Sequence, residues 1–137
     1  LATFIALFGL NALFHTFVAA ALYDPHLGGI TLPMSQANPF LVALVDVVLV
    51  AVMAYFILRA GAPPVQRREA FKAGALVGLV GAWTYNTVNA ALIPSWPVLG
   101  TIVDVLWHVA LGGLCAVLMA WVYNALADRD KWSTAQT

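Results

Sequence analysis

The stretch VLGTIVDVLWHVALGGLCAVLMAWVYNAL, residues 98–126, decides the fold class, because it is almost entirely apolar and long enough to cross a lipid bilayer. A spanning helix needs about 20 apolar residues for a hydrocarbon core of about 30 Å. Comparable runs cover residues 1–22, 40–59 and 71–92. The runs are continuous rather than alternating, and backbone groups in lipid must hydrogen-bond within their own segment. Each run is therefore predicted to be a helix.

The composition supports the same class. Of the 137 residues, 63% are hydrophobic and 9% are charged, whereas a soluble domain is about 45–50% apolar and about 25% charged. We therefore predict one all-α domain over residues 1–137, an integral membrane four-helix bundle surrounded by membrane lipids. The formal net charge of +0 and the lack of a basic stripe exclude nucleic acid as a partner. Cys115 is the only cysteine, which excludes an internal disulfide and a CxxC motif.

The positions of the basic residues predict the orientation of the chain. All 6 Lys and Arg residues lie in the connection 59–72 or in the tail 128–137, and the connections 23–39 and 93–98 have none. Cytoplasmic connections of membrane proteins carry an excess of Lys and Arg. We expect both termini and the connection 59–72 in the cytoplasm, and the bundle in the bacterial inner membrane. Trp96 lies in a short turn and suits the membrane interface.

The depth of the polar residues predicts one shared site. At about 1.5 Å of rise per residue, the strongly polar side chains inside the runs fall in the outer half of the bundle. Each predicted helix supplies at least one of them. We expect a polar cluster that opens outward and is closed on the cytoplasmic side by apolar residues. Its members are Asn11, His15, Asp46, Tyr85, Asn86, Asn89, Asp104, Trp107 and His108.

The first and last runs carry the same short pattern, which reads Asn or Asp, any residue, Leu, an aromatic residue and His. It extends from Asn11 to His15 in one run and from Asp104 to His108 in the other. Residues four apart share a helix face, so each histidine lies on the same face as its Asn or Asp.

A second helix face is marked by small residues in the third run, which let a neighbouring helix approach closely. We expect this face to point inward and to carry two polar residues with it. The face comprises Gly74, Gly78, Gly81, Ala82, Tyr85 and Asn89.

An ionisable group at mid-membrane costs about 2.5–3.5 kcal/mol on insertion scales, so a function is the default hypothesis for it. The residue types leave four roles open. A satisfied hydrogen-bond network would fix the helix register. A haem or pigment would take His15 and His108 as axial ligands. A proton or small-solute path would use the Asp and His groups as relays. A zinc, iron or manganese site would use imidazole and carboxylate ligands. Its candidate ligands are His15, His108, Asp46 and Asp104.

The string YNTVNAALIPSWPVLGTIVDVLWHVALG, residues 85–112, resembles the signature of a family of small bacterial membrane proteins of unknown function, the domain of unknown function 2177 type. Tyr85, Asn89, Asp104 and Trp107 match it, as do Trp96 and Pro97. The resemblance implies a four-span inner-membrane protein and supplies no activity. This chain departs from the signature where Asn86 replaces Asp, Val88 replaces Thr and His108 replaces Gly.

We predict from these observations an accessory or structural subunit of a larger membrane complex, whose polar cluster holds its helices in register. The alternative is a metal-, haem- or pigment-binding protein, an oxidoreductase in one version, that uses His15 and His108. The third hypothesis is a small transporter or lipid binder. No arrangement of nucleophile, base and acid is recognisable in the sequence, so catalysis is not expected. His108 is the first residue to mutate.

Overall fold

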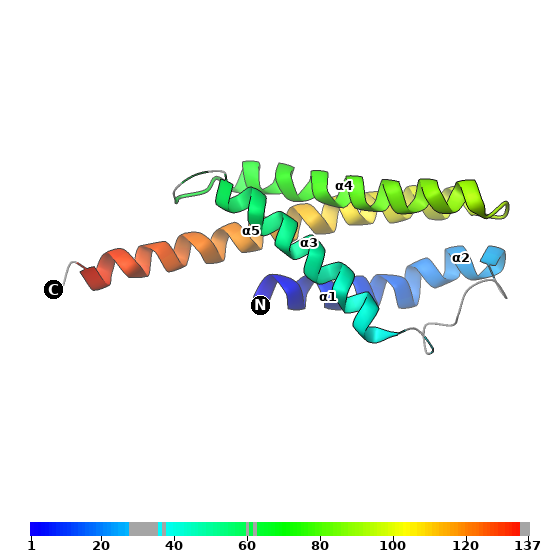
Figure 1. Cartoon of the computed structure of the whole chain (residues 1–137), viewed down its shortest axis with the longest axis horizontal. Coiled ribbons are helices and arrows are strands. Elements are labelled where there is room, and N and C mark those ends of the chain that lie inside the picture. The colour runs from blue at the N-terminus through cyan, green and yellow to red at the C-terminus, as the bar shows by residue number, and fades with distance from the viewer. Residues whose placement is uncertain (28–35, 37, 60, 62, 135–137) are drawn as a thin grey trace.

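The computed structural model describes residues 1–27, 36, 38–59, 61 and 63–134, with side chains as far as residue 128 (Figure 1). All regular structure within these residues is helical. The elements are α1 (Ala2–Phe14), the π-helix η1 (His15–Ala19), α2 (Ala20–Leu27), α3 (Pro39–Arg59), α4 (Arg67–Leu92) and α5 (Val98–Thr134). Because α1, η1 and α2 follow one another without a break, the chain forms an all-α bundle of four helical segments.

Three of the helical segments are long and apolar enough to cross a membrane, namely Ala2–Leu27, Pro39–Arg59 and Val98–Asp128. The helix α4 is not among these three, although the run 71–92 was also expected to cross the bilayer. Its 26 residues give it the necessary length, but Asn86, Asn89 and its glycines make it less hydrophobic. It runs alongside the first part of α5 (Figure 1), which shields part of its polar surface from the surroundings.

The helix ends differ from the predicted ones at several places. The first segment continues through Pro25 to Leu27, although a connection was expected from residue 23. This extra turn is held by tertiary contacts, because Leu27 is buried and Ser95 donates a hydrogen bond to the carbonyl of His26. The helix α4 begins at Arg67 rather than residue 71, and α5 continues to Thr134 rather than residue 126. The rest of the predicted connection 23–39 lies largely outside the described residues.

The close packing of α4 against α5 depends on glycines. A Cβ atom on Gly74 would collide with the Gly112 carbonyl, and a Cβ on Gly78 would collide with the His108 carbonyl. Gly74 and Gly78 are four residues apart and so lie on one helix face. The prediction that this part of the face points inward is therefore confirmed, whereas Gly81 has only a Leu49 methyl group nearby, at 3.7 Å.

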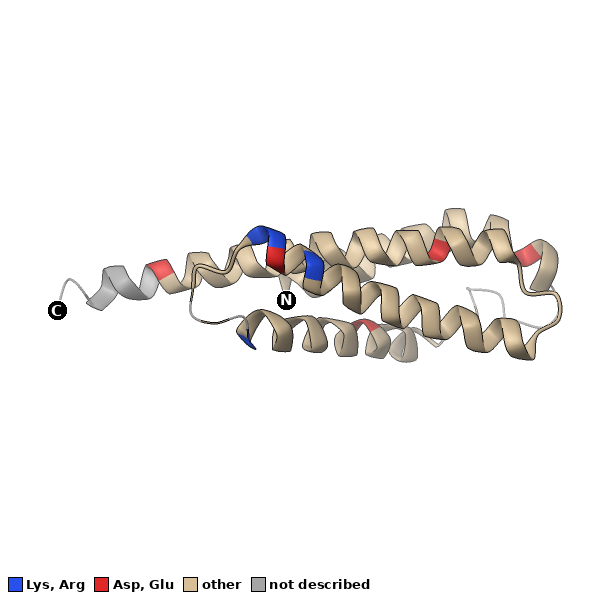
Figure 2. Ribbon diagram, turned by 90° about the horizontal axis from the view of Figure 1, so that it is seen from above, with Lys and Arg blue, Asp and Glu red and all other residues tan. Residues whose placement is uncertain are grey.

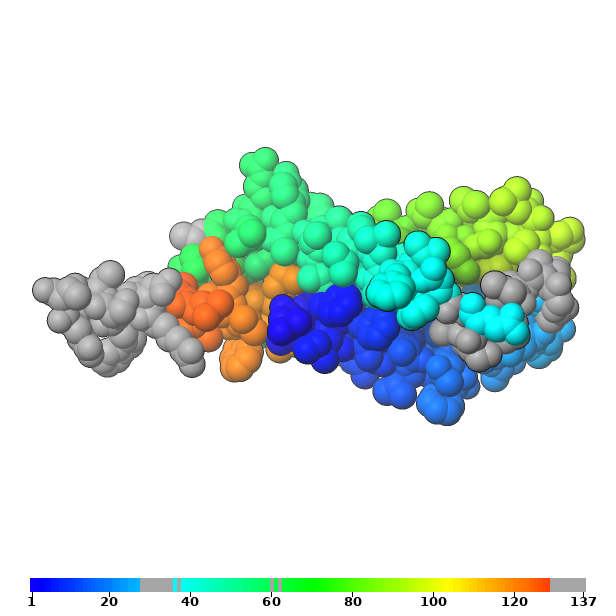
Figure 3. Space-filling model, turned by 60° about the horizontal axis from the view of Figure 1, so that its bottom comes forward, coloured from blue at the N-terminus to red at the C-terminus, as the bar shows by residue number. Residues whose placement is uncertain are grey.

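The apolar core lies between the predicted polar residues and the end of the bundle from which α5 extends. All four helical segments contribute to it, and its largest members are Leu7, Met53, Ile57 and Leu111. The helix α3 contributes little else, since Asp46 is its one further buried residue. On the face seen in Figure 3, α1 and α3 lie side by side, and most of the apolar side chains of α3 remain uncovered.

An asparagine late in α5 binds the backbone that leads into α4. The Asn124 carbonyl accepts a hydrogen bond from the Val65 amide at 2.8 Å, and its Nδ2 donates to the Val65 carbonyl at 3.0 Å. The described Lys and Arg residues lie at this same end of the bundle (Figure 2). The residues concerned are Arg59, Arg67, Arg68 and Lys72.

Candidate functional site

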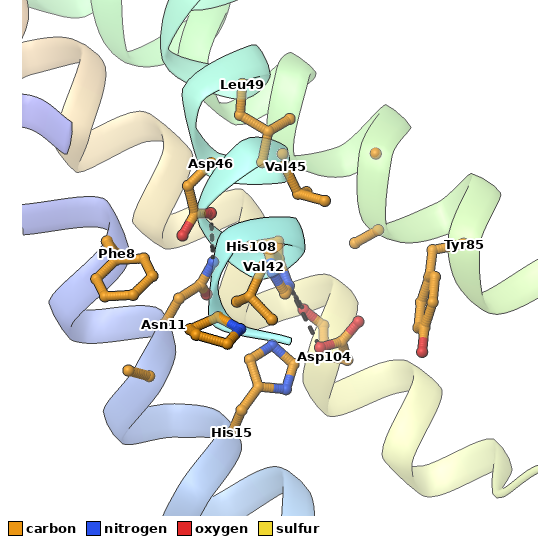
Figure 4. A pocket seen from close by; sticks show the side chains of 15 residues that line it. Phe8, Asn11, His15, Val42, Val45, Asp46, Leu49, Tyr85, Asp104 and His108 are labelled. Carbon is orange, nitrogen blue, oxygen red and sulfur yellow. Dashed lines mark hydrogen bonds and ion pairs between the residues drawn. The ribbon is translucent and has the colours of Figure 1, made fainter. Parts of the chain in front are cut away.

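A hollow of about 460 Å³ lies between the helices, and most of the predicted polar residues line it (Figure 4). Its size falls within the range of about 300–1,000 Å³ found for small-molecule sites. Aliphatic, aromatic and glycine residues form most of the wall, and five polar residues other than tyrosine reach it. The lining consists of Phe8, Asn11, Ala12, His15, Pro39, Val42, Val45, Asp46, Leu49, Gly78, Gly81, Ala82, Tyr85, Asp104 and His108.

Two histidines and one aspartate converge in the lining of the hollow. His15 begins η1, whereas Asp104 and His108 lie one turn apart on α5. One ligand-type atom from each of these residues lies within 4.8 Å of the other two. The His108 Nδ1 lies 2.8 Å from the Asp104 carbonyl oxygen and 3.3 Å from the Asp104 Oδ1. This arrangement brings together three of the four predicted metal ligands.

The fourth predicted ligand, Asp46, is occupied differently. Its Oδ1 accepts a hydrogen bond of 3.1 Å from the Asn11 Nδ2. Among the described residues, the group of converging ligand atoms consists of His15, Asp104 and His108, so Asp46 is not part of it. The Asn11 carbonyl in turn accepts a bond of 3.1 Å from the Trp107 indole. Asn11 thus joins α1, α3 and α5 through a single amide.

A second amide, that of Asn86, joins α2, α4 and α5. Its Nδ2 donates to Asp104 Oδ2 at 2.7 Å and to the Ala82 carbonyl at 2.9 Å. Its Oδ1 accepts from the Tyr23 hydroxyl at 2.9 Å and from the Trp96 indole at 3.3 Å. Asn86 is 0% exposed, and these four bonds use both of its donors and both of its acceptor sites.

Three residues of this second network were not among the predicted site residues. Tyr23 and Trp96 reach Asn86 directly, and Thr101 accepts a bond of 3.0 Å from the Trp96 indole. Trp96 therefore points into the bundle as well as lying in its turn. The rings of Tyr23 and Tyr85 contact it at centroid distances of 5.1 and 5.9 Å. In the sequence, only the hydroxyl groups of Tyr23 and Thr101 and the indole N–H of Trp96 indicated that these residues could join a hydrogen-bond network.

Two predicted site residues lie away from the converging groups. The Asn89 Nδ2 donates to the Tyr85 carbonyl within its own helix, and Asn89 does not line the hollow. Tyr85 lines the hollow with a ring that is 59% exposed. The expectation that the glycine face carries both residues inward is therefore wrong for Asn89. The neighbouring Asn86 faces α5 instead.

The two copies of the short sequence pattern face each other. The rings of Phe14 and Trp107 stack at a centroid distance of 4.7 Å, and the rings of His15 and His108 lie 5.9 Å apart. The copy in the first segment meets the π-helix η1 at His15. Insertions of π-helix in α-helices are rare and occur frequently at functional sites, and no residue pattern in the sequence indicated this one.

A family profile described as a predicted membrane protein (DUF2177) matches residues 1–121. No curated protein and no solved structure matches the chain. The profile therefore covers every residue of the hollow and of both asparagine networks.

Proposed function

This chain belongs to the DUF2177 family of predicted membrane proteins, and from that premise we propose that it binds a single-chain amphiphile from the bilayer in the hollow of Figure 4. The observation that carries the proposal is a hollow of about 460 Å³ with mainly apolar walls and a few polar groups in its lining. Such a combination of an apolar pocket and a few convergent polar groups is the usual form of a ligand site.

The exposure of the wall indicates where the ligand comes from. Val42 and Val45 line the hollow from α3 and are 42% and 60% exposed, and Tyr85 lines it from α4. The two valines lie in a helix that is apolar enough to span a membrane. An opening beside them faces lipid, so an acyl or similar chain enters without leaving the apolar phase. Because the acyl chain already lies in an apolar phase, its transfer into the hollow gains little free energy. The head group therefore supplies the selectivity.

The polar groups that line the hollow fit an oxygen-bearing head group. The Asn11 amide, the two imidazoles and the two carboxyl groups offer both donors and acceptors in the lining of the hollow. A hydrogen bond formed there is shielded from water. A head group that left these buried donors and acceptors without partners would bind less tightly, because unsatisfied buried polar groups are costly. A long-chain carboxylic acid is the simplest probe with these properties.

The test uses the full chain in detergent, with palmitate added in the presence of a metal chelator and native mass spectrometry as readout. The expected result is one palmitate per chain. Val45→Trp fills the hollow and is expected to abolish the adduct. Val48→Trp is the matched control, because Val48 is 53% exposed on the same helix and does not line the hollow. Equal palmitate binding by both variants would contradict the proposal.

The uncovered face of α3 supports a second candidate, an accessory subunit of a larger membrane assembly. Phe40, Leu44 and Val48 repeat at intervals of four and are 83%, 55% and 53% exposed, so they form one apolar face. A photoreactive residue at Val48 tests this candidate in native membranes. Crosslinks to a single protein species would support it, and crosslinks to lipid alone would contradict it.

The proposed location is the bacterial inner membrane, with the connection 59–72 and both termini in the cytoplasm. The support is the charge distribution, since the described Lys and Arg residues gather at the end of the bundle toward which α5 extends (Figure 2). Reporter fusions at the C-terminus test it. Fluorescence of a cytoplasmic reporter is expected, and activity of a periplasmic reporter would contradict this orientation.

A further inference from the structure

We propose that His15, Asp104 and His108 form a binding site for a divalent first-row transition metal ion, with Zn²⁺ as the reference ion. The site shares one wall of the hollow with the amphiphile, but it stands on separate observations and does not require a bound amphiphile. It also differs from the four-ligand set that the sequence suggested, because Asp46 is left out.

The three ligand groups are already close to the spacing that a metal needs. Their ligand-type atoms lie within 4.8 Å of one another. Around a tetrahedral zinc ion, with metal–ligand distances of about 2.0–2.3 Å, neighbouring ligand atoms are about 3.3–3.7 Å apart. Rotations of the side chains would close the remaining gap. Two imidazoles and one carboxylate are also a recurrent ligand set for zinc and for iron.

A buried oxygen without a partner points independently to a ligand at this place. Asp104 is 3% exposed, and its Oδ2 is satisfied by Asn86. Its Oδ1 is the one buried side-chain nitrogen or oxygen in the described part of the chain that has no hydrogen-bond partner. A buried polar atom without a partner costs about 1–3 kcal/mol, and an ion or water is the usual explanation. The same oxygen lies beside the His108 ring.

The hydrogen bond of His108 prepares its ring for a metal. A carbonyl oxygen only accepts hydrogen bonds, so the Nδ1 that lies 2.8 Å from the Asp104 carbonyl carries the proton of this bond. The Nε2 then keeps a free lone pair. Metal-binding histidines usually donate their other ring N–H to a carbonyl or carboxylate, which fixes the ring orientation and the tautomer.

The Asn86 bond does the same for the carboxylate, since it fixes Oδ2 and leaves Oδ1 without a hydrogen-bond partner. His15 makes no hydrogen bond within the described residues, so no such bond has to break when its ring turns toward the ion. Three protein ligands leave one position of a tetrahedral ion open. That position adjoins the hollow, where water or an oxygen of a bound molecule would complete the coordination.

The experiment uses the full chain, purified with a tag other than polyhistidine, stripped with a chelator and titrated with ZnCl₂ by calorimetry. One Zn²⁺ per chain is expected, together with a rise in the melting temperature, because a ligand that binds only the folded state stabilises it. The substitutions His15→Gln and His108→Gln are each expected to weaken binding at least about a hundredfold, since the loss of an outer-shell partner alone costs about 10–100-fold.

The third histidine provides the matched control. His26 lies in α2 and is exposed, so His26→Gln should retain the affinity of the parent chain. His15→Gln is the decisive variant, because it removes no hydrogen bond within the described residues, and its melting temperature without metal shows whether it is folded. The proposal is overturned if the parent chain binds no Zn²⁺, or if a well-folded His15→Gln variant binds it equally well.

The two proposals fail separately. Palmitate binding is measured with the chelator present, so it is expected whether or not the metal site exists. Zn²⁺ binding is expected to survive Val45→Trp, which fills the hollow without removing a ligand. Palmitate without Zn²⁺ would overturn only the metal site, and Zn²⁺ without palmitate would overturn only the amphiphile site. A visible absorption band in the protein as purified would instead indicate haem or a pigment and would overturn the metal-ion proposal.

Discussion

Phe14 and Trp107 stack face to face, with ring centroids 4.7 Å apart and ring planes 5° from parallel. This pair joins the two copies of the sequence pattern and connects α1 with α5 beside the two histidines. Phe14 also contacts both imidazoles edge-on, at centroid distances of 5.3 and 6.4 Å. The aromatic pair therefore fixes the distance between the two helix segments that carry His15 and His108.

The stack is expected to contribute its own coupling energy. In a double-mutant cycle of Phe14→Leu and Trp107→Leu, measured by SDS unfolding in mixed micelles, we expect a coupling of about 0.5–1.5 kcal/mol. A cycle of Phe14→Leu with Trp121→Leu is the control, because Trp121 is 57% exposed and makes no ring contact with Phe14. A coupling near zero for the first cycle would show that the stack is incidental.

The two asparagines of α4 are expected to differ sharply in their effect on stability. Asn86→Ala removes four hydrogen bonds, among them the bonds to the Tyr23 hydroxyl and to the buried Asp104 Oδ2. The expected loss is about 3 kcal/mol, the upper end for an unsatisfied buried group. Asn89→Ala removes one bond to its own helix and should cost about 0.5 kcal/mol or less. Equal losses in the free energy of unfolding would contradict the observed register of α4.

The glycines of α4 provide a matched test of helix approach. Gly78→Ala places a Cβ against the His108 carbonyl, so α4 and α5 must separate; overpacking of this kind costs about 1–3 kcal/mol. Gly81→Ala meets only the Leu49 methyl group at 3.7 Å, an ordinary contact. It should be neutral or stabilising, since alanine favours a helix by about 1 kcal/mol over glycine. Thermal unfolding of both variants checks this, and a destabilised Gly81→Ala with an unaffected Gly78→Ala would refute the packing.

The Asn124 amide is expected to protect the backbone at Val65. Asn124→Leu removes both of its hydrogen bonds to that residue, so the Val65 amide should exchange its hydrogen at least about tenfold faster, the factor for about 1.4 kcal/mol of lost protection. Hydrogen–deuterium exchange with mass spectrometry measures this. Gln66→Ala is the control, because the Gln66 side chain is exposed and makes no hydrogen bond within the described residues. An unchanged rate in Asn124→Leu would show that the two Asn124 hydrogen bonds do not protect the Val65 amide.

Most of the helices could be predicted from the sequence, because the length of an apolar run is enough to indicate a spanning helix. The runs 40–59 and 98–126 were both recovered within α3 and α5. The misses occurred where tertiary contacts override local signals. Pro25 remained helical while Leu27 packed into the bundle, and a π-helix at His15–Ala19 changed the register of the first segment. No residue pattern distinguishes a helix that continues through Pro25 from one that ends there, or this π-helix from a regular α-helix.

The candidate site shows the same division. Spacing of four residues correctly placed Asp104 and His108 on one face, because that relation belongs to a single helix. It did not show that Asp46 would pair with Asn11, or that Asn86 rather than Asn89 would meet Asp104. Those pairings depend on how far each helix is rotated about its own axis and how closely its neighbour approaches.

The sequence by itself determined that this chain is a helical membrane protein of the DUF2177 family, and it predicted one shared polar site. The length of the apolar runs, the positions of the charged residues and the order of the motifs can be read from the sequence directly. They do not depend on contacts between helices. Only the tertiary structure decided that His15, Asp104 and His108 converge while Asp46 stays with Asn11. The reason is that the glycine contact of Gly78 with His108 and the stack of Phe14 on Trp107 set the helix separations.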